Sequence, residues 1–152
     1  NLEAYNKTES HCKVDILAGD SMQYINPKTN KRLQNISVNK TKCKKFFVKL
    51  SYKGNLPAKA MGHNGVISSK KNKASIVNEA MSAGPTKSYM PKASNKNVIA
   101  KSNHLIGGGK GDKSVDILMV DTSLLSTKEA YQMFCTFPGH AAMMQADIKV
   151  LS

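Results

Sequence analysis

One short segment, Phe134–Met144, brings together three side chains that bind metal ions. It contains a thiol at Cys135, an imidazole at His140 and a thioether at Met144. A strand ending at Cys135, followed by a Pro-Gly turn, would form a tight loop that points all three at one spot. A second imidazole must come from elsewhere in the chain, and His63 is the best candidate.

This mixture of donors favours copper. Thiolate and thioether are soft ligands that suit Cu(I), and imidazole suits both oxidation states. Two histidines and one cysteine in a plane, with a distant axial methionine, define a type 1 (blue) copper site. Structural zinc commonly uses Cys-x-x-Cys pairs, which this sequence lacks. The Cys-x4-His-x3-Met spacing alone also fits a core cysteine near a surface histidine, so the wider sequence must decide.

The segments around these residues predict an all-β protein. Apolar and polar residues alternate with a period of two, which is typical of half-buried strands in an antiparallel sandwich or barrel. The alternating segments are Val14–Ile16, Phe46–Leu50, Val115–Met119, Tyr131–Cys135 and Ile148–Val150. Residues 74–81 instead predict a short helix that ends near Gly84-Pro85.

The length of 152 residues predicts one domain. Residues 1–10 are polar and without periodicity, so we expect a flexible leader there and a folded domain over residues 11–152. No apolar run is long enough to span a membrane, so no transmembrane segment is predicted.

The chain is strongly basic, with a net charge of +13 from 23 Lys and Arg against 10 Asp and Glu. Arg32 is the only arginine. Lysine is a hydrated point charge, whereas arginine is favoured for bidentate contacts to bases. The charge therefore indicates a long-range field that attracts acidic partners or anionic surfaces, or a basic surface without a specific partner. No specific nucleic acid is predicted.

Two longer motifs carry a resemblance to a known family. Cys-Thr-Phe-Pro-Gly-His-x-Ala-x-Met (residues 135–144) and Gly-Asn-Leu-Pro-x-x-x-Met-Gly-His-Asn (residues 54–64) resemble the azurins, bacterial cupredoxins of the periplasm. Shorter matches occur at Asp20–Tyr24, Met81–Gly84, Val98–Ala100 and Leu105–Gly107. The likeness runs from about Cys12 to Leu151. It implies a Greek-key β-sandwich of about eight strands with one short helical insertion.

The resemblance implies a role for each matching residue around a single type 1 copper ion. His63, Cys135 and His140 would be equatorial ligands, Met144 the long axial ligand, and the Gly62 carbonyl a fifth contact.

Residues next to these ligands match the family as well. Asn64 would hold the ligand strands together. The backbone amides of Asn64 and Phe137, near the Cys135 sulfur, would tune the reduction potential. Cys12 and Cys43 match the family's disulfide pair, which leaves Cys135 free for metal and implies an oxidising compartment.

The implied function is one-electron transfer rather than enzymatic catalysis. Partners would dock on an apolar patch around His140, which we call the docking face. Its residues are Leu56, Met61, Met81, Pro138, Ala142 and Met143. The partners would be redox proteins such as c-type cytochromes or a periplasmic reductase, with acidic surfaces. A periplasmic location implies that a signal peptide has been removed, because the polar start contains none.

Two alternatives remain open at this point. A periplasmic copper-binding protein for storage, delivery or tolerance would use the same ligands without cycling electrons. A basic adhesion or nucleic-acid-binding module would instead bind DNA in a salt-sensitive way.

The sequence also departs from the family. Gly65 stands where many azurins carry a bulky apolar residue, and the chain has no Trp, so this space is either filled by a neighbour or left as a cavity. Tyr52 replaces a histidine that is linked to a pH-dependent backbone change, so we expect that effect to be absent.

Overall fold

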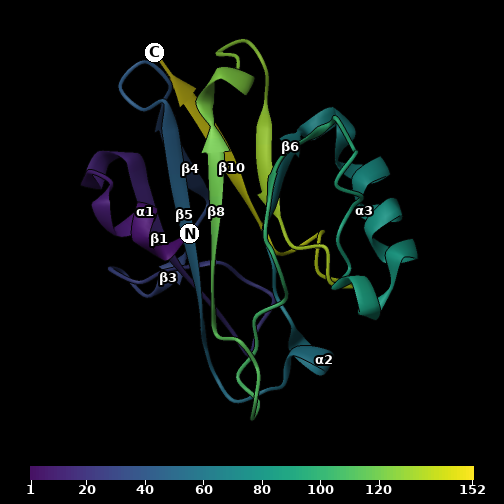
Figure 1. Ribbon diagram of the computed structural model, residues 1–152. Coiled ribbons are helices and arrows are strands. Elements are labelled where there is room, and N and C mark those ends of the chain that lie inside the picture. The colour runs from purple at the N-terminus through teal and green to yellow at the C-terminus, as the bar shows by residue number, and fades with distance from the viewer.

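The computed structural model describes residues 1–152 and contains two five-stranded sheets packed as a sandwich (Figure 1). In spatial order, the first sheet consists of β3 (Lys31–Arg32), β2 (Ile25–Asn26), β1 (Lys13–Gly19), β5 (Lys45–Lys53) and β8 (Val115–Asp121). The second consists of β4 (Asn35–Asn39), β10 (Gln145–Leu151), β9 (Tyr131–Phe134), β6 (Val66–Ser69) and β7 (Val98–Lys101).

Helices occupy the connections and the N-terminus. The α-helices are α1 (Leu2–Lys7), α2 (Ala58–Met61) and α3 (Lys73–Ala83). Short 3₁₀ turns lie at Ser10–Cys12, Lys70–Asn72, Pro85–Lys87 and Thr122–Leu124. No helix is long and apolar enough to cross a membrane.

The all-β sandwich with a short helical insertion is confirmed. Eight strands have four residues or more, and only β2 and β3 are shorter, with two residues each. The expected antiparallel pairing is only partly right, because β1 pairs in parallel with β5 and β4 in parallel with β10. The reason is topological: between β1 and β5 the chain crosses to the other sheet to form β4 and then returns.

The core lies between the sheets, and on β8 it is formed by residues that lie in between and after the alternating apolar residues of the Val115–Met119 segment. Leu118 and Val120 face the core, whereas Val115 and Met119 are exposed. Ile117 lies on the outer face and is nevertheless buried. Both faces of this strand are apolar, so alternation alone could not choose between them.

The buried Ile117 is covered by α1, in the segment expected to be a flexible leader. Tyr5 of this helix packs with Phe47 and Ile117 on the outer face of the first sheet. Its hydroxyl donates a hydrogen bond to Asp15. Residues 2–7 therefore form a helix that packs on the first sheet, and the flexibility of residues 1–10 stays a prediction. Where the independently folding unit begins stays a prediction.

The predicted helix is present as α3, on the side of the molecule opposite α1 (Figure 1). Ile76 and Ala80 form its buried face. The helix ends at Gly84, whose φ of 75° favours glycine.

The space beside Gly65 is filled. A Cβ atom added there would lie 3.1 Å from Met133 Sδ and 3.3 Å from both Leu118 Cδ2 and Leu50 Cδ1. These neighbouring side chains therefore occupy the volume that a larger residue would need.

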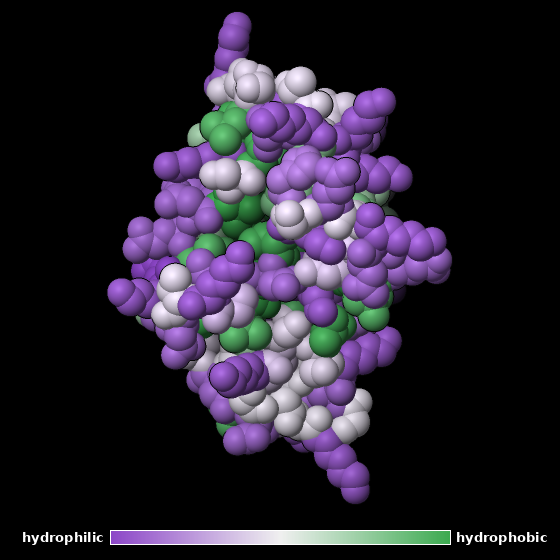
Figure 2. All heavy atoms as spheres, turned by 90° about the vertical axis from the view of Figure 1, so that its left-hand side faces the viewer, coloured by the Kyte–Doolittle hydropathy of each residue, from purple (hydrophilic) through white to green (hydrophobic).

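Hydrophilic side chains project around the face that carries α1, with an area of hydrophobic side chains at its centre (Figure 2). This appearance agrees with the net charge of +13. A lysine-rich surface of this kind produces a positive field around the molecule.

Candidate metal centre

The segment Cys135–Met144, which we call the ligand loop, connects β9 to β10. The Cys135 N–H donates to the Met144 carbonyl (3.1 Å) and closes the loop at its base. Inside it, the Met144 N–H donates to the His140 carbonyl (2.8 Å). Gly139 adopts a φ of 81°, a conformation that side-chain-bearing residues rarely adopt. The Pro-Gly turn thereby brings His140 back toward the start of the loop.

His63 reaches the same place from a distant part of the sequence. Its backbone forms a bridge with Ile106, through hydrogen bonds of 3.1 and 2.9 Å. Its Nε2 lies 2.6 Å from the Gly19 carbonyl, at the end of β1. Because a carbonyl only accepts, Nε2 must carry the proton, and Nδ1 is left as the free donor atom. The Tyr52 ring stacks on the His63 ring, with centroids 5.5 Å apart.

The three strongest predicted donors converge in the interior. The Cys135 Sγ lies 3.6 Å from His140 Nδ1 and 4.0 Å from His63 Nδ1. All three donor atoms lie within 4.8 Å of one another. Cys135 and His63 have no exposed surface, and His140 retains 3%. One soft thiolate and two imidazoles within this radius fit a copper ion.

Burial governs the electrostatics of these groups. It lowers the pKa of His140 to about 4, with a further contribution from the nearby His63. It also lowers the pKa of His63, against the hydrogen bond to Gly19. Both imidazoles are therefore neutral at pH 7, as metal binding requires. Burial raises the pKa of the Cys135 thiol to about 12, while hydrogen bonds from the Asn64 and Phe137 amides act in the opposite direction.

Asn64 joins the two ligand segments. Its side chain accepts a hydrogen bond from the Thr136 N–H and donates one to Thr136 Oγ1, both 2.8 Å long. The Thr136 hydroxyl in turn donates to the Tyr89 carbonyl (2.6 Å). The fully buried Tyr24 donates to the Asn64 carbonyl (2.7 Å). The residues next to His63 and Cys135 are therefore fixed to each other.

The other predicted site residues lie around this centre. Met144 is fully buried in the same core cluster as Cys135, and Gly62 is buried beside His63. In the docking face, Met61 is half-buried and the remaining residues are exposed. Met81 and Ala142 line a groove of about 510 Å³ between α3 and the ligand loop.

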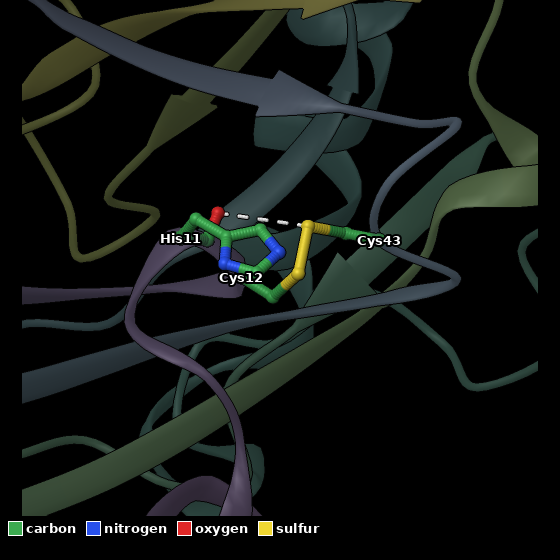
Figure 3. Close-up of side chains that lie close together, drawn as sticks. All are labelled: His11, Cys12 and Cys43. Atoms are coloured by element: carbon green, nitrogen blue, oxygen red, sulfur yellow. Dashed lines mark hydrogen bonds between the residues drawn. A yellow bond between two sulfur atoms is a disulfide. The ribbon is translucent and has the colours of Figure 1, made fainter.

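Cys12 and Cys43 form the predicted disulfide (Figure 3). His11 lies next to it, and its carbonyl oxygen is 3.5 Å from the Cys43 sulfur. Because both sulfurs are bonded to each other, this cluster offers no thiolate to a metal ion. His104 lies beside Asp116 and takes no part in the candidate centre.

Sequence reasoning missed two contacts of this centre. Gly19 fixes the His63 ring, and the Thr136 side chain completes the pairing with Asn64. Thr136 lies inside the recognised motif, so its position was a usable signal. Gly19 acts through its backbone carbonyl, which every residue type has, so its identity could not indicate this contact.

Comparisons with known proteins agree with this geometry. The family model for copper binding proteins of the plastocyanin/azurin family matches residues 10–151. The chain is 40% identical to an azurin of Pseudomonas aeruginosa over 139 residues, which cover 91% of this chain and 98% of that protein. It is 38% identical to an azurin of Alcaligenes faecalis with the same coverage.

A solved structure is similar as well. The azurin Az-iso2 of Methylomonas sp. strain J matches with a TM-score of 0.78 and 30% identity, covering 93% of this chain and 98% of that chain.

Proposed function

Because this chain belongs to the plastocyanin/azurin family of copper-binding proteins, we propose that it is a one-electron carrier whose copper ion is held by His63, Cys135 and His140. Met144 and the Gly62 carbonyl would add weaker contacts to the bound ion. The observation that carries this assignment is the convergence of one thiol and two imidazole Nδ1 atoms within 4.8 Å in the interior.

When bound, copper supplies a Cu(I)/Cu(II) couple that stores and releases one electron. The protein supplies a water-excluding pocket and keeps the donor atoms in place. The Asn64 and Phe137 amides stabilise negative charge on the Cys135 sulfur. The hydrogen bond from His63 to the Gly19 carbonyl and the closed ligand loop resist movement of the ligands. This keeps the reorganisation energy of electron transfer small.

His140 would be the route by which an electron passes between the bound ion and a partner. Of the four side-chain ligands, it alone retains exposed surface, and the exposed Pro138 and Met143 lie in the same loop. Apolar side chains around a ligand suit brief encounters that bury little area. The positive field favours partners with acidic surfaces, such as c-type cytochromes or a reductase. The Cys12–Cys43 disulfide supports a periplasmic location. As an electron carrier, the protein would transform no substrate.

Copper titration tests the ligand set. Adding Cu(II) to the copper-free protein should produce an intense blue absorption band that disappears on reduction and returns on oxidation. Cys135→Ser should abolish the band, and His63→Ala should shift or abolish it. His104→Ala is the matched control and should leave it unchanged, because His104 lies beside Asp116 instead. A full blue band in Cys135→Ser would contradict the proposed site.

A further inference from the structure

The ammonium group of Lys73 contacts three segments around the ligand loop. It donates hydrogen bonds to the Gln132 side-chain oxygen (2.7 Å), the Ala141 carbonyl (2.8 Å) and the Gln145 side-chain oxygen (2.5 Å). An ammonium group has three N–H donors, so all of them are used.

These acceptors are distributed on both sides of the loop. Gln132 lies in β9, three residues before Cys135, and Gln145 opens β10 directly after Met144. Ala141 follows His140 within the loop. A single side chain from α3 therefore holds both ends of the loop and its middle.

The position of Lys73 is unfavourable in other respects. It is the first residue of α3, where the helix dipole disfavours a positive charge. It is also half-buried, and this burial lowers its pKa. Its three acceptors are uncharged, and Asp147, whose charge acts against the lowering of the Lys73 pKa, is engaged by Gln132 and Lys70. The contacts to the loop offset these costs, together with the Phe134 ring, whose centroid is 5.3 Å away.

We propose that Lys73 is a positioning residue, which holds the ligand loop in its metal-binding shape and places a fixed positive charge beside it. The inference rests on the proposed copper function. Held by Lys73, the loop keeps its shape before the metal binds. The charge disfavours the more positive Cu(II) state, so Lys73 raises the reduction potential.

Hydrogen exchange of the copper-free protein tests the loop directly. In Lys73→Met, the backbone amides of His140, Met143 and Met144, which are hydrogen-bonded within the loop, should exchange at least tenfold faster than in the wild type. The matched control is Lys71→Met, which removes the same charge from a side chain that is 70% exposed and pairs with Glu129. In the control, these amides should exchange at the wild-type rate.

The copper-loaded variants provide a second readout. Lys73→Met should have a lower reduction potential and an altered electron paramagnetic resonance spectrum, whereas Lys71→Met should match the wild type. Lys73→Gln, which removes the charge but keeps a polar group, serves if Lys73→Met does not fold.

Either of two results would overturn the inference. One is that the loop amides of Lys73→Met exchange at the same rate as those of Lys71→Met. The other is that the two variants have the same reduction potential. A wild type without a blue band would instead refute the copper function, and the exchange experiment would still test the loop.

Discussion

Asn64 and Thr136 exchange two hydrogen bonds of 2.8 Å in the buried interior and so fix the segment of His63 to the ligand loop that begins at Cys135. This pairing makes the relative position of the two ligands a property of the protein rather than of the metal. Pre-organisation of this kind requires every polar group to be satisfied, and no buried side-chain nitrogen or oxygen lacks a partner.

Removal of the Thr136 hydroxyl should weaken this pairing. Thr136→Val keeps the shape but leaves Asn64 Nδ2 and the Tyr89 carbonyl without their partner. We expect a loss of about 1–3 kcal/mol in the free energy of unfolding, measured by urea denaturation of the copper-free protein. Thr136→Ser keeps the hydroxyl and should lose less. Equal losses in the two variants would show that the hydrogen bonds do not matter.

Gly65 and Met133 should show strong energetic coupling. Gly65→Leu inserts atoms where Met133 Sδ already lies, and overpacking of this kind costs about 1–3 kcal/mol. Met133→Ala empties a fully buried site at a cost of about 2–5 kcal/mol. The double variant should lose at least about 1 kcal/mol less than the sum of the two, as measured by urea denaturation. Additive losses would mean that the two positions do not share one space.

The docking of α1 should make stability depend on pH in the alkaline range. Burial raises the pKa of Tyr5 to about 12, and the hydrogen bond to Asp15 and its charge add to this. The pKa of the unfolded state is lower, about 10. The stabilising contribution is therefore complete below about pH 10 and is lost as the pH rises toward 12.

Tyr5→Phe isolates this effect from the titration of the lysines, among which Lys13 and Lys49 face the ring. The free energy of unfolding should decrease less steeply between pH 10 and 12 in Tyr5→Phe than in the wild type. Identical slopes would contradict a buried, neutral Tyr5.

Loss of the disulfide should lower stability without changing the metal centre. Cys12 and Cys43 are 31 residues apart, and opening a loop of this length costs ~4 kcal/mol in the chain-entropy model. Cys12 precedes β1, and the His63 contact is at Gly19, the other end of that strand. A seven-residue strand places these ends about 20 Å apart. The double variant Cys12→Ser, Cys43→Ser should therefore unfold at lower urea concentration yet keep the blue band, and a lost band would refute this separation.

The docking face can be tested with a c-type cytochrome as electron acceptor. Met143 is 56% exposed, and truncation to serine removes about 1 kcal/mol of apolar contact. Met143→Ser should lower the second-order rate constant several-fold, as measured by stopped-flow absorption. Leu124→Ser, with a similar exposure of 53% outside the docking face, is the control and should change it less than twofold. Equal effects would argue against docking around His140.

Much of the candidate centre followed from the sequence because its ligands are concentrated in one loop. Cys135, His140 and Met144 lie in one loop between two strands, so their donor atoms can converge, and the wider motifs around them identified them as ligands. The helix α3 and the sandwich were predictable for a similar reason, since periodicity is a local property.

Only the tertiary structure decided the rest, because those features depend on contacts between distant residues. Both faces of β8 are apolar, and pairing with β5 determined which of them faces the core. The packing of α1 depends on an apolar surface that exists only once β5 and β8 are paired, because Tyr5 contacts Phe47 and Ile117. Met133 fills the space at Gly65, and Lys73 reaches across to the ligand loop. The sequence determined which atoms could bind copper, whereas long-range packing decided how firmly they are held.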